Sequence, residues 1–243
     1  MTNYWVFLAL FLIATFAGAL VAGLSGFAFG LVAASIWLFI LTPQETAMLI
    51  IGFGLVVHGY SVWKFGHALD WSRLWPFLAG ATIGVPAGVY VLTWASPAHI
   101  RAGVGVLLVA YSLYSLFRPA IKPIAAGGKG ADAAVGFLNG VLAGITGLAA
   151  ILVTIWCGLR GWPKEQQRAV FQPVAVAIFI MSALWLGAKG VVTAEIGWLF
   201  LLGLPALLAG TWLGMQLYGK LDEAKFRNVV LVLLLVSGIA LVF

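Results

Sequence analysis

Eight apolar stretches separated by short loops constrain this chain more than any other feature of its sequence. Only 8% of its residues are charged, against roughly 25% in an average soluble domain. These charges are too few to cover the outside of a water-soluble fold of this size. The exterior of the protein must therefore face lipid. Most stretches approach the ~20 apolar residues that a spanning helix needs. They are 4–41, 46–63, 74–94, 100–117, 133–159, 169–188, 196–218 and 228–243. The sequence predicts an all-α polytopic membrane protein.

The two halves of the chain resemble each other at four places that follow in the same order. The paired segments are AGLSG at 22–26 with AGITG at 143–147, TPQE at 42–45 with WPKE at 162–165, GVPAG at 84–88 with GTWLG at 210–214, and PAHIR at 97–101 with EAKFR at 223–227. The four offsets are 121, 120, 126 and 126, as expected after a duplication with small insertions. We therefore predict two membrane repeats, 1–118 and 133–243, joined by a cytoplasmic linker loop at 119–132.

The placement of Lys and Arg favours repeats of opposite orientation. If each half is a hairpin that enters and leaves on one side, followed by three spans, one side receives eleven basic residues and the other only two, Arg101 and Lys189. The eleven are Lys64, Arg73, Arg118, Lys122, Lys129, Arg160, Lys164, Arg168, Lys220, Lys225 and Arg227. If the first segment of each half instead crosses once, the split becomes seven against six. The positive-inside rule therefore selects inverted repeats with both termini outside.

The length of the first segment in each half bears on whether it is re-entrant. The 27 residues of 133–159 would make about 40 Å of helix, so two limbs of about 20 Å cannot each cross a core of about 30 Å. We expect these limbs to stop near the middle of the membrane, with AGITG at the tip. The segment 4–41 is longer and leaves open a re-entrant hairpin or two complete spans around AGLSG.

Glycine-rich breaks recur in both halves and are the predicted substrate site. An irregular tip survives in lipid only when it is buried or lines a wet cavity. Glycine permits the tight turn, and the following limb would aim its N-terminus, the positive end of the helix dipole, at the gap. Broken helices of this kind bind substrates in transporters. The alternative is that Gly23, Gly26, Gly30, Gly144 and Gly147 are ordinary helix-packing residues. The predicted substrate-binding residues at the breaks are Ser25, Gly26, Phe27, Thr146, Gly147 and Leu148.

Three further polar residues lie within apolar stretches and complete the candidate site. Asn139 lies on the first limb of the second hairpin, and Gln172 precedes Pro173, which frees a backbone carbonyl. His58 lies inside the stretch 46–63. A polar group inside the membrane is a functional candidate. For His58 an interhelical hydrogen bond is an equally good interpretation.

Several activities find no support in the sequence. No HExxH, GxSxG or Walker motif is present, and the seven acidic residues fall in or beside loops, so we expect neither an enzyme nor a cation pump. Cys157 is the single cysteine and the three histidines are scattered, so no metal site or cofactor is predicted. The net charge of +6 comes from isolated residues without a basic run, which argues against nucleic-acid binding.

The segment AGLSGFAFGLVA followed by the TPQE turn resembles the sulfite exporter TauE/SafE family. The second copy, VGFLNGVLAGITGLAA and then GWPKEQQRAV, falls where that family repeats the pattern. The resemblance covers the chain from about residue 12 to its end, although SGFAFG replaces the family's usual run of three glycines and a proline. It implies transport, usually export, of a small sulfur-containing or organic anion across a prokaryotic inner membrane. By position, it places the substrate at 25–27 and 146–148, with Gln172 beside it.

Together these features predict a secondary transporter of a small anion, such as sulfite or an organosulfonate, that alternates access around two breaks at the membrane midplane. The alternatives are a passive anion channel of the same architecture, a membrane-embedded enzyme or redox subunit, and a non-transporting partner subunit. The predicted partners are the anion and the lipid bilayer. The sequence leaves open the coupling ion, H⁺ or Na⁺, and whether the chain forms a homo-oligomer.

Overall fold

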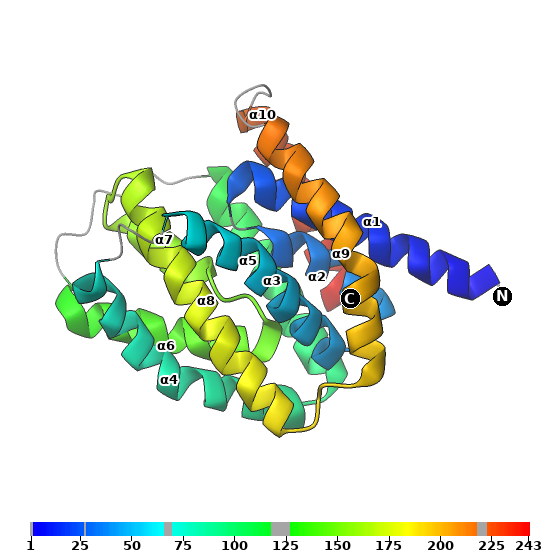
Figure 1. The fold of residues 1–243 in the computed structure, drawn as a ribbon, viewed down its shortest axis with the longest axis horizontal. Helices are drawn as coiled ribbons and strands as arrows, with labels where there is room; N and C mark the ends of the chain where they lie inside the picture. Colours follow the sequence, from blue (N-terminus) through cyan, green and yellow to red (C-terminus); the bar gives the residue numbers. More distant parts are fainter. Residues whose placement is uncertain (1, 27, 66–69, 118–126, 218–222) are drawn as a thin grey trace. The chain divides into compact units, whose positions relative to one another are not determined.

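The computed structural model describes residues 2–26, 28–65, 70–117, 127–217 and 223–243, and these residues form ten α-helices and no strand (Figure 1). The helices are α1 (Thr2–Ser25), α2 (Phe29–Ile40), α3 (Pro43–Phe65), α4 (Trp71–Trp94), α5 (Pro97–Phe117), α6 (Gly128–Thr146), α7 (Ile151–Leu159), α8 (Lys164–Ala188), α9 (Ala194–Leu217) and α10 (Glu223–Val242).

Among the described residues, five helices are long and apolar enough to cross a membrane: α1, α4, α5, α8 and α9. Many large apolar side chains lie on the outside of these helices. Trp94, Phe117 and Leu184, for example, are 79%, 79% and 69% exposed. In water such a surface would be unfavourable, whereas in lipid it is the expected exterior. The prediction of an all-α polytopic membrane protein is confirmed.

Short polar motifs set several helix ends. Thr42 and Glu45 form a capping box at the start of α3: the Thr42 N–H donates to Glu45 Oε2 at 2.8 Å, and the Glu45 N–H donates to Thr42 Oγ1 at 3.3 Å. Asp70 caps α4 by accepting from the Ser72 N–H at 3.1 Å. The TPQE motif therefore marks the start of a helix.

The contacts divide the chain into two units that each draw on both halves of the sequence. Unit 1 comprises Met1–Ile50, Ala95–Pro119 and Thr193–Phe243, and unit 2 comprises Ile51–Trp94 and Ala120–Val192. Unit 1 therefore contains α1, α2, α5, α9 and α10, unit 2 contains α4, α6, α7 and α8, and α3 is divided between them. These units are defined by contacts, whereas the two repeats were predicted from sequence similarity. The boundary between the repeats at 119–132 therefore stays a prediction.

In unit 1, α1 and α9 run parallel and approach each other through glycines. A methyl group added at Gly210 would lie 2.5 Å from the carbonyl oxygen of Phe16, and one added at Gly214 would overlap the carbonyl oxygen of Leu20 and lie 3.0 Å from the Cα of Gly23. Small residues permit this backbone-to-backbone packing, which is typical of helices in membranes.

In unit 2, α4 and α6 make the same kind of contact, also in parallel. A methyl group added at Gly84 would overlap the carbonyl oxygen of Phe137, and one added at Gly88 would overlap that of Val141 and lie 3.0 Å from the Cα of Gly144. Gly84 and Gly88 correspond to Gly210 and Gly214 at an offset of 126, while Phe137, Val141 and Gly144 correspond to Phe16, Leu20 and Gly23 at an offset of 121. The two helix pairs thus meet at equivalent positions.

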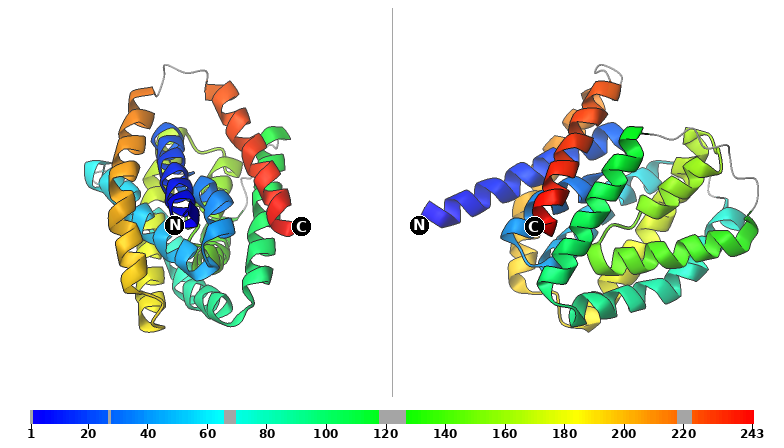
Figure 2. Two further views of the ribbon diagram at one scale, coloured as in Figure 1. Left: turned by 90° about the vertical axis from the view of Figure 1, so that its right-hand side faces the viewer. Right: turned by 180° about the vertical axis from the view of Figure 1, so that it is seen from behind.

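A third pair, α5 with α10, lies in unit 1 and runs antiparallel (Figure 2). A methyl group added at Gly105 would lie 2.6 Å from the carbonyl oxygen of Gly238, and one added at Gly238 would lie 2.8 Å from the carbonyl oxygen of Gly105. These two helices occupy equivalent places, as the last helix of each half of the sequence.

Candidate functional site

The second half of the chain begins with an antiparallel helical hairpin, α6 and α7, that belongs to unit 2. Helix α6 ends at Thr146, because Gly147 has a left-handed backbone (φ 77°) and donates its N–H to the Ala143 carbonyl at 2.7 Å. The limbs are unequal: α6 has 19 residues and α7 has 9, about 28 and 14 Å. The chain reverses at the predicted AGITG segment, and the limbs differ in length instead of measuring about 20 Å each, since α6 starts at Gly128 and the 146–150 turn leaves α7 short.

The first half begins with a matching hairpin, α1 and α2, in unit 1. Gly26 has a left-handed backbone (φ 87°) and donates its N–H to the Ala22 carbonyl at 2.7 Å. The Trp37 ring stacks on Phe11 with centroids 5.2 Å apart, and a methyl group at Gly18 would lie 3.0 Å from the Phe29 carbonyl oxygen, so α2 runs back along α1. Helix α2 has 12 residues, about 18 Å, and is too short to cross the membrane.

The two predicted hydroxyls, Ser25 and Thr146, make similar hydrogen bonds at the two breaks. Ser25 Oγ donates to the Val21 carbonyl at 2.8 Å and accepts from the Ala28 N–H at 3.3 Å. Thr146 Oγ1 donates to the Leu142 carbonyl at 2.7 Å and accepts from the Leu148 N–H at 3.1 Å. Each hydroxyl therefore links the last turn of one limb to the reversed chain, and each would have to rotate to donate to an anion.

Asn139 fastens the second hairpin together. Its side-chain amide donates to the Ala149 carbonyl at 2.6 Å, and its side-chain oxygen accepts from the Leu152 N–H at 3.1 Å, in the first turn of α7. The residue is fully buried. Its amide proton and its oxygen are thus engaged in positioning the tip. The equivalent position in the first hairpin, at an offset of 121, is Gly18.

The remaining predicted residues lie at different distances from the tip. Leu148 is buried at the tip itself, and Phe27 lies outside the described residues. Gln172 is buried on α8, a helix that packs against both limbs of the second hairpin. His58 is buried on α3 with its ring centroid 5.8 Å from that of Phe179 on α8. Unit 2 therefore brings together Asn139, the 146–148 turn and the helix that bears Gln172. His58 contacts the same helix, α8, at Phe179.

Two of the recurring glycines have a different role from the one predicted. Gly23 and Gly144 pack against α9 and α4 respectively, so for them the helix-packing alternative holds. Gly26 and Gly147, three residues further on, form the breaks. The AGxxG segment thus combines a helix contact and a chain reversal in five residues.

A polar cluster that the sequence did not single out lies at the open end of the second hairpin. Asp132 on α6 is buried and accepts from the Trp156 Nε1–H at 2.7 Å, with an Arg160 nitrogen at 3.4 Å. Asp132 and Arg160, like Asn139 and Leu152, lie at nearly equal sequence distances on either side of the tip. This spacing is the signal that could have predicted them. Among the described residues, no three His, Cys, Asp or Glu side chains are grouped so as to hold a metal ion.

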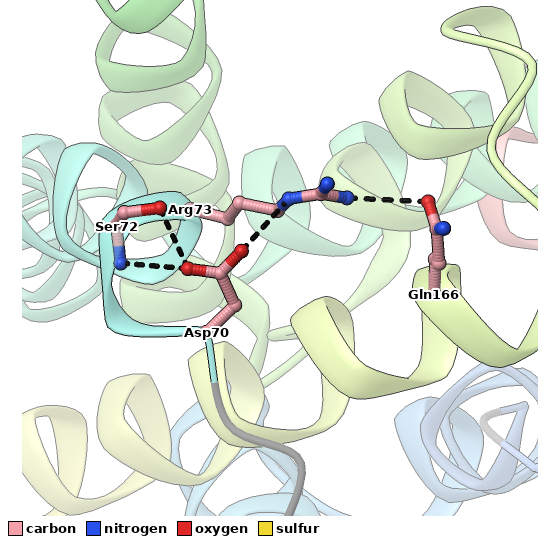
Figure 3. A network of polar contacts seen from close by, with 4 residues as sticks. All are labelled: Asp70, Ser72, Arg73 and Gln166. Carbon is pink, nitrogen blue, oxygen red and sulfur yellow. Dashed lines mark hydrogen bonds and ion pairs between the residues drawn. The ribbon is translucent and has the colours of Figure 1, made fainter.

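The cluster continues to the starts of α4 and α8. The Arg160 and Arg73 guanidinium groups lie 5.5 and 5.2 Å from the Trp162 ring centroid. Arg73 also pairs with Asp70 at 3.0 Å and donates to Gln166 Oε1 at 3.2 Å (Figure 3). The hydrogen bond that the Ser72 hydroxyl donates to Asp70 lowers the pKa of this exposed carboxyl below its ordinary value. The starts of α4 and α8 and the end of α7 are thus joined on one side of unit 2.

Comparison with known proteins gives one match. No curated protein and no solved structure matches the chain. The family described as "Sulfite exporter TauE/SafE" matches residues 10–241, which is nearly the full length and includes both hairpins and all the helix pairs described above. The chain therefore belongs to the sulfite exporter TauE/SafE family of membrane transport proteins.

Proposed function

We propose that the chain is a secondary transporter, working as an exporter, of a small anion such as sulfite or an organosulfonate across a prokaryotic inner membrane. Membership of a sulfite exporter family supports the substrate class. The observation that carries the proposal is the pair of helix breaks at Gly26 and Gly147, which both have a left-handed backbone and are both preceded by a hydroxyl that donates to a carbonyl of the preceding turn. Short helices with N-termini at a break provide N–H groups and a positive dipole end for an anion.

The helix directions support two inverted repeats. In equivalent positions, α1 runs parallel to α9 and α4 runs parallel to α6, which fits a common ancestor for the halves. Helices α5 and α10 are equivalent but run antiparallel within unit 1. Equivalent helices point in opposite directions when each half makes an odd number of crossings, and point the same way when it makes an even number. Each half is then a re-entrant hairpin followed by three spans.

The contacts at the helix ends support the same topology. Arg73 and Arg160 both lie beside the Trp162 ring, so the loops before α4 and after α7 are on one side. If the first segment of each half crossed only once, these two residues would lie on opposite sides. Arg101, one of the two basic residues assigned to the other side, donates to the Leu41 carbonyl at the end of α2. The cluster around Trp162 is then cytoplasmic.

At the site we assign different roles to the predicted residues. The backbone around Gly147–Leu148 would contact the anion, with Gln172 reaching it from α8, and the contacts of Gly26 and Phe27 with the anion stay a prediction. Ser25, Thr146 and Asn139 would hold the two breaks in shape, since their hydrogen bonds in this structure are made within the hairpins. Transport would follow from rocking of the repeats around the breaks, coupled to H⁺ or Na⁺.

The first experiment is thermal unfolding of the purified protein in detergent with sulfite, sulfate, thiosulfate, taurine, sulfoacetate and short carboxylates. An anion that binds only the folded protein at a hundred times its Kd should stabilise it by about 2.7 kcal/mol. We expect a shift with a sulfur oxyanion or sulfonate, and saturable counterflow of that anion in proteoliposomes. No shift with any anion would refute the transporter and favour a partner subunit, and flux without counterflow would favour a channel.

We expect Gly147→Val to abolish transport and leave membrane insertion intact. A branched side chain disfavours the left-handed backbone at this position by about 1–2 kcal/mol and would fill the tip. Anion counterflow measures the loss. Gly190→Val is the matched control, because Gly190 has a similar backbone (φ 72°) in the loop after α8 with open space around it. Equal loss in both variants would mean that backbone strain alone, and not the tip, is responsible.

Membrane-impermeant thiol labelling tests the topology. In a Cys157→Ala background, a cysteine at Lys129 should react only from the cytoplasmic side and a cysteine at Lys189 only from outside, since both positions are exposed. Labelling of both from one side of intact cells would overturn the inverted arrangement.

A further inference from the structure

His58 is a buried polar side chain whose role the hairpins do not account for. It is 3% exposed on α3, and its Nδ1 is buried without a hydrogen-bond partner. A buried nitrogen without a hydrogen-bond partner lowers the stability of the fold, so its presence calls for an explanation. A function that needs the free lone pair of Nδ1 would provide one. The interhelical hydrogen bond considered from the sequence is not made by Nδ1.

The His58 ring contacts an aromatic residue of α8 in unit 2. Its ring lies 5.8 Å from the Phe179 ring, centroid to centroid. One turn earlier on α3, a methyl group added at Gly54 would lie 2.6 Å from the Phe179 ring, so Gly54 and His58 together enclose this ring. Neither neighbour can donate to or accept from Nδ1.

On α8, which bears Phe179, the charged residues lie near the two ends of the helix. Arg168 lies eleven residues, about 16 Å, before Phe179, and Lys189, just after the last turn, lies ten residues after it. On α3 itself, Glu45 lies in the first turn and Lys64 lies six residues after His58. A proton on this imidazole would therefore be an uncompensated charge in the membrane interior unless an anion accompanied it.

The anion site proposed above lies within electrostatic reach along α8. Gln172 and Phe179 are seven residues apart, two turns of helix, so they share a face of α8 about 10 Å apart. The same helix packs against α6 and α7. A charge on His58 and an anion beside Gln172 would attract each other, and we expect this attraction to change the affinity for the anion on the order of tenfold.

We propose that Nδ1 of His58 is the proton-binding site that couples proton movement to anion transport. This inference rests on the proposed transporter function. The step is a simple protonation: a proton from water bonds to the Nδ1 lone pair, the imidazole becomes imidazolium, and the proton leaves again on the other side of the membrane. Because the imidazolium and the bound anion compensate each other, each raises the affinity for the other by the same factor. Proton and anion then cross together, so that export follows the outward gradient of the anion.

The test uses whichever fully ionised anion stabilises the protein most among sulfate, thiosulfate and sulfoacetate, so that the ligand itself does not titrate between pH 5 and 8. In the wild type its affinity should rise on the order of tenfold as pH falls from 8 to 5, because a proton on His58 favours the bound anion. Anion addition in weak buffer should cause proton uptake, seen with an indicator dye. An inward pH gradient should drive anion accumulation in proteoliposomes.

In His58→Gln, or His58→Asn if the first variant does not fold, affinity should become independent of pH, and pH-driven accumulation should be lost. His99→Gln is the control, since His99 is exposed at the start of α5 and should behave as wild type. Wild-type binding without pH dependence or proton uptake would overturn the proposal, as would pH-driven accumulation in His58→Gln. Absence of anion binding and of counterflow in the wild type would instead overturn the transporter function itself.

Discussion

Gly88→Ala should destabilise the protein by about 3 kcal/mol or prevent its folding, although it adds a single methyl group. That methyl would overlap the Val141 carbonyl oxygen and lie 3.0 Å from the Cα of Gly144. Both obstacles are backbone, so no side chain can rotate away and α4 must separate from α6. Overpacking a tight interface costs about 1–3 kcal/mol and occasionally more. Thermal unfolding in detergent measures the effect.

Gly103→Ala is the matched control because Gly103 lies within α5 with no atom within 4 Å of the added methyl. It should melt at or slightly above the wild-type temperature, since alanine is the better helix former. Gly214→Ala in α9 should resemble Gly88→Ala, as the methyl would overlap the Leu20 carbonyl oxygen at the equivalent place. A stable Gly88→Ala variant would show that α4 and α6 do not approach this closely.

Asn139→Leu should destabilise the second hairpin by about 2–5 kcal/mol and abolish transport. The change leaves the Ala149 carbonyl and the Leu152 N–H without partners in a fully buried place. Each unpaired buried group costs about 1–3 kcal/mol. Thermal unfolding and anion counterflow measure the two effects, and hydrogen exchange at the start of α7 should increase.

The corresponding control is Asn228→Leu, at an exposed position of α10, which should change stability by less than about 0.5 kcal/mol. If Asn139→Leu folds and unfolds as the wild type but no longer binds the anion, Asn139 is a substrate ligand. Its role in holding the tip would then be wrong.

The breaks of both hairpins could be predicted from the sequence because they depend on local chemistry. A glycine with a left-handed backbone ends a helix wherever it stands, and AGxxG recurs in both halves, so Gly26 and Gly147 were identifiable. The lengths of the two limbs could not be predicted in the same way. Helix α6 begins five residues before the apolar stretch, at Gly128, because the end of a helix need not be apolar and Asp132 finds partners across the hairpin.

The partners of helices and side chains could not be predicted, because they depend on where distant segments meet. The spacing of Gly84 and Gly88 indicates a close neighbour but does not identify α6 as that neighbour. Asn139 was recognisable as an unusual polar residue, but its bonds to Ala149 and Leu152 follow only once α7 is known to run back along α6. The hydrogen bonds of Ser25 and Thr146 could not be predicted either, because the sequence does not show that a hydroxyl donates to a carbonyl of its own helix.

The composition of the two units has a consequence for the order of events during synthesis. Unit 2 is built from residues 51–192, so its paired helices are complete well before the chain ends. Unit 1 needs both ends of the chain, and the glycine face of α1 must wait for α9, more than 180 residues later. At about 5–20 residues per second, that wait lasts on the order of 10–40 seconds. The glycine face of the first helix to leave the ribosome is thus among the last surfaces to find its partner, and until then it depends on lipid or on the insertion machinery to cover it.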